Sequence, residues 1–236
     1  MKAMILAAGL GTRMRPLTDH CPKPLLRAGG RPLIDFHLAK LAAAGVSEVV
    51  VNCSWLADQV QGYLSSTNCY DLRMHLSREE QPLETAGGIV QALPYLDSDD
   101  DAPFLLVNGD VWTDFDFSRL LNCRPQAAHL VLIENPPHHP SGDFALTDAG
   151  LVTEDDLGPR HTFSGISVWR PSMFRDLAQG RRALKPLMQS AIAKGGLSGE
   201  LFQGHWWDIG TPQRLADLDD FLSASPRPAD SAPKVP

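Results

Sequence analysis

Cysteine is scarce in this chain of 236 residues, which has four, at positions 21, 53, 69 and 123. None of them forms a Cys-x-x-Cys pair, and the sequence has no His-Glu-x-x-His motif. The sequence therefore indicates neither a zinc site nor a redox-active dithiol. Sparse, irregularly spaced cysteines are typical of proteins in a reducing compartment.

Long apolar runs and an excess of positive charge are also missing. No segment approaches the length of a membrane span, and no signal-peptide pattern precedes the first apolar run, so we expect a cytoplasmic protein without a membrane partner. The formal net charge of −7 argues against general binding of nucleic acid. The ordinary share of hydrophobic residues, 43%, predicts a globular protein with one well-buried core.

The most distinctive segment is the first apolar run and the turn that follows it. Residues 2–8 have the composition of a buried strand, and Ala8, Gly9, Gly11 and Thr12 then form a glycine-containing turn. Positive charge follows at Arg13, Arg15 and Lys23. Glycine lets the main chain approach a ligand and expose its N–H groups, and Arg and Lys add charges that suit phosphate oxygens. The pattern predicts a polyphosphate site at the carboxyl end of the first strand.

Two better-known glycine loops do not match this turn. A dinucleotide-binding fingerprint needs a third glycine where this chain has Met14, and a P-loop needs a Gly-Lys-Ser/Thr tripeptide that does not follow. An ordinary tight turn between strand and helix would account for the glycines. It would give no reason for three cations beside exposed N–H groups.

Strand-like and helix-like segments alternate through the first half of the chain. Apolar β-rich runs are expected at 2–8, 46–52, 72–76, 104–107 and 129–134, with helices at 32–45, 54–64, 88–93 and 116–121. Residues 77–88 are expected to form an irregular loop. This alternation predicts right-handed crossovers and an α/β fold with a mostly parallel sheet flanked by helices.

The amino-acid composition changes after Glu134, where proline, glycine and aspartate become frequent. Short β-like pieces such as 144–146 predict a small β-rich lobe, followed by a strand at 162–169 and helices at 183–194 and 211–222. We therefore expect a single domain over 1–222, with a nucleotide-binding half over about 1–134 and a sugar-binding, metal-completing half over about 135–222. Residues 223–236 are expected to be a flexible tail.

Residues 7–18 (AAGLGTRMRPLT), with Pro22-Lys23-Pro24 downstream, resemble the signature of the sugar-1-phosphate nucleotidylyltransferases. The resemblance continues through 108–110 (NGD) and 207–212 (WDIGTP), so it covers the chain to about Leu222. It implies a Rossmann-like nucleotidyltransferase fold with a mixed sheet. The implied reaction joins a nucleoside triphosphate to a sugar 1-phosphate and releases pyrophosphate.

The resemblance also implies roles for individual residues. Asp110 and Asp208 match the carboxylates that hold one Mg²⁺ in the family, and Mg²⁺ prefers hard oxygen ligands. Arg13 and Lys23 are the predicted catalytic residues, Arg13 on the leaving pyrophosphate and Lys23 near the reacting phosphates. Main-chain groups at Ala8, Gly9, Gly11 and Thr12 are expected to cradle the triphosphate. Because the attacking phosphate is already an anion near neutral pH, the mechanism needs no general base.

The base and the sugar are predicted from less distinctive residues. Gln81 and Gly87 are expected beside the base, since glutamine offers both a donor and an acceptor to a pyrimidine edge. Asn108, Asp143 and Glu154 are the predicted sugar-binding residues. His138 and His139 are candidate contacts for a lactyl carboxylate, although adjacent histidines in a proline-rich loop are more often simply exposed.

Longer runs, including 82–88 (PLETAGG) and 138–144 (HHPSGDF), resemble bacterial N-acetylmuramate 1-phosphate uridylyltransferases, which act in cell-wall recycling. The implied substrates are UTP and a sugar 1-phosphate, with no nucleic-acid partner. Alternatives are a mannose- or heptose-1-phosphate guanylyltransferase, a glucose-1-phosphate thymidylyltransferase, or a catalytically silent sensor of nucleotide sugars. The chain lacks the carboxyl-terminal domains of some relatives, so we expect a monomer or a small homo-oligomer.

Overall fold

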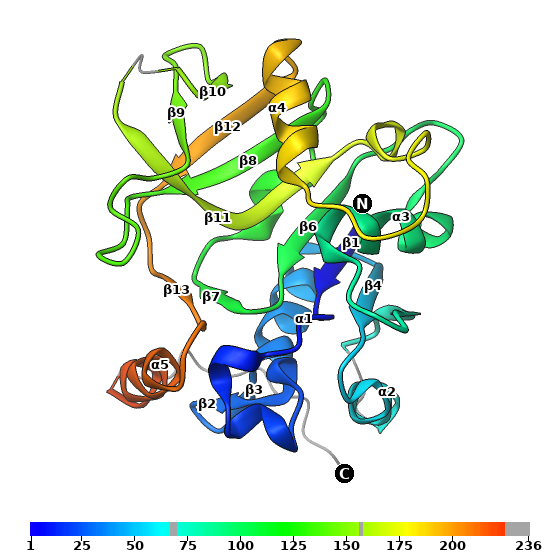
Figure 1. Cartoon of the computed structure of the whole chain (residues 1–236), viewed down its shortest axis with the longest axis vertical. Coiled ribbons are helices and arrows are strands. Elements are labelled where there is room, and N and C mark those ends of the chain that lie inside the picture. Colours follow the sequence, from blue (N-terminus) through cyan, green and yellow to red (C-terminus); the bar gives the residue numbers. More distant parts are fainter. Residues whose placement is uncertain (67–69, 156–157, 225–236) are drawn as a thin grey trace.

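The computed structural model of the protein describes residues 1–66, 70–155 and 158–224. Within these residues one sheet of nine strands forms the centre of the molecule (Figure 1). Its parallel part has the order β6–β1–β4–β5, with β1 at Lys2–Leu6, β4 at Glu48–Cys53, β5 at Arg73–Arg78 and β6 at Phe104–Asn108. The polar residues that end these strands therefore meet at one edge of the sheet, as their sequence positions predict.

The sheet becomes mixed beyond β6. The long strand β11 (Arg160–Trp169) runs antiparallel to β6 and to β8 (Ala128–Ile133). Strand β12 (Leu197–Phe202) adds a parallel neighbour to β8, and β9 (Phe144–Leu146) with β10 (Val152–Thr153) joins the amino end of β11. The expected β-rich lobe is thus continuous with the main sheet rather than a separate one.

Helices cover both faces of the sheet. Alternate residues of a strand point to opposite faces, so Ala3 and Ile5 of β1 face one side and Met4 the other. Helices α1 (Leu33–Ala44) and α2 (Ala57–Ser66) pack on the first face, and α3 (Glu84–Leu96) and α4 (Lys185–Ala193) on the second. The result is three layers, with no side of the central strands left to water.

A third apolar cluster lies beside the sheet, where residues between 14 and 33 pack against residues between 207 and 222. Helix α5 (Pro212–Ala224) packs against β13 (Trp206–Asp208) and β2 (Arg27–Ala28), which pairs with β3 (Arg31–Pro32) (Figure 1). Strand β13 also pairs antiparallel with β7 (Val111–Thr113). Trp207 contacts Trp112 and Phe221, so aromatic packing fixes β13 in place.

The fold class is confirmed, two local predictions are wrong, and one strand was not predicted. Helix α3 begins at Glu84, so 84–88 is helix rather than loop. Strand β12, the strand without a prediction, follows α4 and runs parallel to β8. Helix α5 includes residues 223 and 224, which were assigned to the tail. Residues 225–236 and Cys69 lie outside the described residues.

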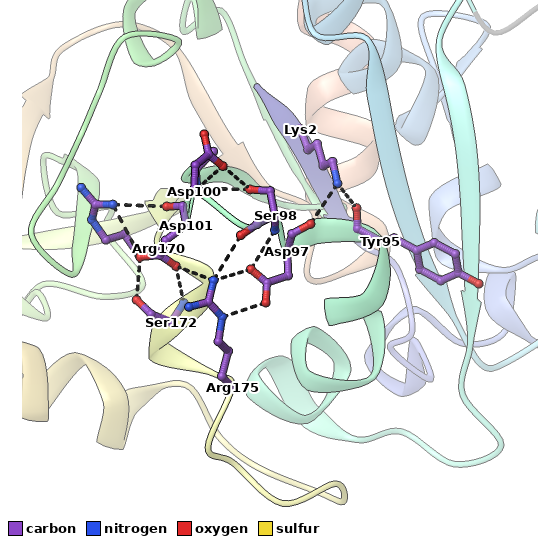
Figure 2. Close-up of polar contacts among 10 residues, drawn as sticks. Lys2, Tyr95, Asp97, Ser98, Asp100, Asp101, Arg170, Ser172 and Arg175 are labelled. Carbon is purple, nitrogen blue, oxygen red and sulfur yellow. Dashed lines mark hydrogen bonds and ion pairs between the residues drawn. The ribbon is translucent and has the colours of Figure 1, made fainter.

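The amino edge of the sheet carries a network of paired charges (Figure 2). Arg175 bonds both carboxylate oxygens of Asp97 at 2.7 and 2.8 Å, and Asp101 accepts two hydrogen bonds from Ser172. The ammonium of Lys2 donates to the carbonyls of Tyr95 and Asp97. In the ranges that the structure describes, no helix has both the length and the apolar character that a membrane crossing requires.

Candidate active site

A cavity of about 650 Å³ lies at the carboxyl ends of the parallel strands. Most of the residues predicted to bind nucleotide or metal line it, namely Ala8, Gly9, Gly11, Thr12, Arg13, Lys23, Gln81 and Asp110, and so does Asn108, which was predicted to bind the sugar. They come from segments up to about a hundred positions apart in the sequence. The topology of parallel strands brings them to one edge of the sheet, which is where open α/β sheets bind ligands.

The glycine turn presents free donors to this cavity. The N–H groups of Gly9, Leu10 and Gly11 have no acceptor within the described part of the protein. Gly11 has a φ of 64°, and a Cβ there would lie 2.7 Å from Thr18 Cγ2, so both conformation and space require glycine. Thr18 Oγ1 in turn donates to the Gly11 carbonyl at 2.7 Å and holds the turn. Such a row of exposed N–H groups suits an anion.

Two cations beside the turn differ in their partners. Lys23 Nζ donates to Asp110 Oδ2 at 2.6 Å, and its side chain is only 11% exposed. Arg13 is exposed and makes no hydrogen bond or ion pair with any residue that the structure describes. A guanidinium without a protein partner, at the wall of a cavity lined by free N–H groups, is placed to pair with an anion from solution.

Asp110 and Asp208 are brought together by two short strands. The register of β7 and β13 places Asp208 opposite Val111, and the N–H of Ile209 donates to the Asp110 carbonyl at 2.7 Å. A Cβ built on Gly210 would lie 3.3 Å from Asp208 Oδ2 and 3.5 Å from a nitrogen of Arg13. Asp208 and Arg13 therefore border the same small space.

The carboxylate of Asp208 has partners that the sequence did not indicate. His138 Nε2 lies 3.1 Å from Asp208 Oδ1, and Arg214 donates to Asp208 Oδ2. His138 reaches this site from the β-rich lobe, so the adjacent histidines are not simply exposed loop residues. His139 contacts Asp143 instead, at 3.1 Å.

The residues at this edge fit a magnesium ion by their donor chemistry. Among the described residues no group of three or more His, Cys, Asp or Glu side chains could hold a metal. One carboxylate, Asp110, directly precedes β7, and the other, Asp208, ends β13, which pairs with β7. Mg²⁺ is usually held by one or two carboxylates together with substrate phosphates and water. Two carboxylates are too few to hold a structural metal ion by themselves. They suit an ion that binds together with a phosphate ligand.

A buried polar brace supports the wall of the cavity. Asn52, at the end of β4, accepts from the N–H of Ala7 at 2.7 Å and donates to Glu79 Oε1 at 2.7 Å. Glu79 Oε2 accepts from the N–H of Leu83 at 2.9 Å, and burial raises the pKa of Glu79. A Cβ on Gly88 would lie 2.6 Å from Glu79 Oε1, so this glycine leaves space for the brace. The brace ties three strand ends to the start of α3.

Gln81 lines the cavity as predicted for a base contact, but Gly87 does not. Gly87 lies in the first turn of α3, where its N–H donates to the carbonyl of Arg182 at 3.2 Å. A Cβ on Gly87 would approach the Gly180 carbonyl to 2.3 Å. This glycine therefore allows close contact between two protein segments, and its N–H is not available to a ligand.

A second cavity of about 480 Å³ adjoins the first and shares Asn108 with it. Asp143 lines it too, with Oδ2 accepting from the N–H of Phe163 at 2.8 Å. Glu154, the third predicted sugar residue, lines neither cavity and bonds Gln189 on α4 instead. The two cavities together offer space for two ligands side by side.

One titratable group is buried behind Asp110. His37 on α1 is fully buried, and its ring hydrogen-bonds the main chain of Val111 while Nε2 has no partner in the described part of the chain. Burial, with a smaller effect of Lys40, lowers the pKa of His37 to about 4. The imidazole is therefore neutral at ordinary pH and supports the turn between β6 and β7.

Sequence reasoning missed several polar residues of the site. Asn52 could have been found, because a polar residue at the end of an apolar strand belongs to the same edge as Asp110. Arg214, three residues after a Thr-Pro helix start, gave no such signal. Arg181 was also missed; it lines the main cavity and pairs with Glu84 at 2.7 Å across its rim.

The similarity of this chain to known proteins extends over nearly its whole length. The family model described as Nucleotidyl transferase matches residues 2–225. The chain is 46% identical over 232 residues to an N-acetylmuramate alpha-1-phosphate uridylyltransferase of Neisseria meningitidis serogroup B, covering 95% of this chain and 99% of that protein. It is 35% identical to a protein of the same name from Caulobacter vibrioides, covering 89% and 92%. A mannose-1-phosphate guanyltransferase of Aspergillus oryzae is 31% identical, and 63% of it is covered.

Solved structures share the fold at low identity. A Bacillus anthracis protein described as a glucose-1-phosphate thymidylyltransferase, in complex with sucrose, has a TM-score of 0.82 and 18% identity, covering 96% of this chain and 97% of that one. HddC from Yersinia pseudotuberculosis, complexed with GMP-PN, has a TM-score of 0.76 and 20% identity, covering 94% and 99%. These likenesses extend over nearly the whole of each chain.

Proposed function

Because this chain belongs to the nucleotidyl transferase family, we propose that it transfers UMP from UTP to N-acetylmuramate 1-phosphate, giving UDP-N-acetylmuramate and pyrophosphate. The observation that carries the choice of substrates is the 46% identity over 95% of the chain to a protein named for that activity. The nucleotide half of the proposal also rests on the site, where the N–H groups of residues 9–11 and the side chain of Arg13, all without a partner among the described residues, face the same cavity as Asp110.

The proposed reaction is an in-line displacement at the α-phosphorus of UTP. A phosphate oxygen of the sugar 1-phosphate forms the new P–O bond, and the bond to the bridging oxygen of the β-phosphate breaks, so pyrophosphate leaves with that electron pair. The nucleophile needs no deprotonation near neutral pH. The protein therefore contributes position and charge, which are the main factors in phosphoryl-type transfer.

Each part of the site has a role in this scheme. The N–H groups of Gly9 and Gly11 bind the triphosphate, and Arg13 balances the charge that develops on pyrophosphate. Lys23 holds the side chain of Asp110 and lies beside the reacting phosphates. Gln81 faces the base, and Asn108, shared by both cavities, lies between nucleotide and sugar.

Asp110 and Asp208 are the residues that would hold Mg²⁺. The bound ion would neutralise phosphate charge and orient the triphosphate. For Asp208 to take part, its carboxylate must be released from at least one of His138 and Arg214, which bond its two oxygens here.

The cellular setting follows from the chemistry of the proposed product. A nucleotide-activated muramate is a cell-wall precursor, so we place the enzyme in peptidoglycan recycling in the cytoplasm. We propose a monomer or small homo-oligomer with no nucleic-acid partner.

The proposal is tested by release of pyrophosphate over a grid of nucleotides and sugar phosphates, with wild type and Asp110→Asn. UTP, GTP and dTTP are each paired with N-acetylmuramate, mannose and glucose 1-phosphates in Mg²⁺. The expected result is highest kcat/KM for UTP with N-acetylmuramate 1-phosphate and its loss in the variant. A higher kcat/KM for GTP with mannose 1-phosphate would overturn the assignment of the substrates. Binding of the ligands without turnover would indicate a sensor.

A further inference from the structure

The second cavity has an apolar floor and a charged rim. Phe144 and Phe163 come from the β-rich lobe, and Met188 comes from α4. Lys185 stands three residues before Met188, so the two lie on the same side of the helix and both line the cavity. The stem of Lys185 is positioned along this apolar wall, and its ammonium can reach a ligand that fills the space.

The charges around this cavity are balanced except at one position. The carboxylate of Glu84 pairs with Arg181, and that of Asp143 bonds His139 and the N–H of Phe163. Lys185 makes no ion pair or hydrogen bond with the residues that the structure describes. It is also the one Lys or Arg among the lining residues. A single unpaired cation in a cavity whose acids already have partners favours an anionic group on the ligand.

We propose that Lys185 recognises a carboxylate carried by the sugar, and so selects an acidic sugar 1-phosphate over its neutral counterpart. The inference rests on the proposed function, which places the sugar in this second cavity. N-acetylmuramate differs from N-acetylglucosamine by a lactyl ether that ends in a carboxylate. The apolar floor would contact the ether's methyl group while Lys185 pairs with its charge.

The sugar phosphate is a less suitable partner for Lys185 than the carboxylate. The phosphate must reach the α-phosphorus, which lies with Arg13, Lys23 and Asp110 in the first cavity, and Lys185 does not line that cavity. The boundary between the cavities consists of Glu84, Thr85 and Asn108, which line both. Lys185 thus serves the part of the sugar that points away from the reacting centre.

The experiment measures binding and turnover with a matched pair of ligands. N-acetylmuramate 1-phosphate and its lactyl carboxamide have nearly the same size and differ in one charge. Each is titrated calorimetrically into wild type, Lys185→Met and Lys185→Arg, with Mg²⁺ and a non-hydrolysable UTP analogue, and pyrophosphate release is followed in parallel. Lys194→Met is the control, because Lys194 is the C-cap of the same helix and lines neither cavity.

Lys185→Met is expected to weaken binding of the acid about tenfold, the usual size of a charge-assisted contact at a partly open site, and to leave the amide unchanged. KM for the acid should rise with kcat little altered, Lys185→Arg should restore most of the affinity, and Lys194→Met should match wild type. Equal losses for acid and amide would assign Lys185 to the phosphate or to folding and overturn the inference. So would equal binding of both by wild type. If wild type discriminates through Lys185 but releases no pyrophosphate, the proposed function fails and the inference stands.

Discussion

At the amino ends of β1 and β6 the charged groups of Figure 2 bond one another, whereas at the carboxyl ends of the same strands Arg13 has no partner among the described residues. Arg175 bonds Asp97 and lies 3.3 Å from Asp101, and Lys2 donates to two carbonyls. The sheet is the same at both ends. Charged groups are also paired at the carboxyl edge, Lys23 with Asp110 and Arg214 with Asp208. The charge of Arg13 differs from these, because it stays available for a ligand to neutralise.

The comparison predicts the largest effect at Arg13. Arg13→Met should lower kcat/KM for pyrophosphate release about a hundredfold, because a charged contact to the transition state contributes on the order of 3 kcal/mol. The urea midpoint should change little, since the guanidinium makes no hydrogen bond or ion pair with the described residues. Arg73→Met, at the amino end of β5, is the control. An equal loss of activity in Arg13→Met and Arg73→Met would contradict the difference between the carboxyl and amino edges of the sheet.

A second prediction concerns His37, which supports the carboxyl edge from behind. Its folded-state pKa of about 4 lies below the ordinary value of 6.5 for histidine, so between these values the unfolded chain binds more protons. Its contribution to stability is therefore complete above pH 6.5 and is lost as the pH falls toward 4, at most about 3 kcal/mol. Urea unfolding of wild type and His37→Gln over pH 4–7 checks this. Parallel pH profiles would contradict it.

A third prediction tests whether the Asn52–Glu79 hydrogen bond needs the space that Gly88 leaves, beyond the general effect of replacing a helical glycine with alanine. Gly88→Ala places a Cβ against the Asn52–Glu79 hydrogen bond, and the strained or broken bond should cost about 1–3 kcal/mol of unfolding free energy. KM for UTP should also rise, because the brace shapes the wall near Gln81. Gly62→Ala in α2 meets nothing within 4 Å and should be neutral or slightly stabilising. The unfolding free energy of both variants is measured by urea denaturation. An unchanged value in Gly88→Ala would show that a Cβ fits beside Asn52 and Glu79 without strain.

The smallest effect is expected at the amino edge. Arg175→Gln removes an exposed guanidinium from the network in Figure 2. It should lower Tm only slightly, and the difference should shrink at high salt, because solvent screens surface charges. kcat and KM should match wild type in the pyrophosphate assay. A loss of activity would mean that the amino edge communicates with the site.

Features encoded in contiguous residues were predictable. The turn after β1 could be identified from Gly9, Gly11 and Arg13, because tight turns and anion binding depend on local residue types. Asp110 could be placed for the same reason, as it follows an apolar run that forms a central strand. Thr211 and Pro212 marked the start of α5, and the Thr211 hydroxyl does accept from the N–H of Arg214 at 3.4 Å.

Features that depend on distant segments were not predictable. Glycines at 87 and 88 disfavour helix, yet α3 begins earlier because the carbonyl of Arg182 accepts the N–H groups of Ala86 and Gly87. Strand β13 has three residues and no periodic pattern, so its pairing with β7 had no sequence signal. Lys185 lines the second cavity because α4 packs beside the β-rich lobe, and the sequence has no local signal for that packing.

The most direct test is a crystal structure of the protein with UTP and Mg²⁺. The triphosphate should lie against the N–H groups of residues 9–11, with Arg13 on its β- and γ-phosphates. The metal should be held by Asp110 and Asp208, with His138 or Arg214 moved away from the latter. A nucleotide bound at another edge of the sheet, or a metal that touches neither aspartate, would contradict it.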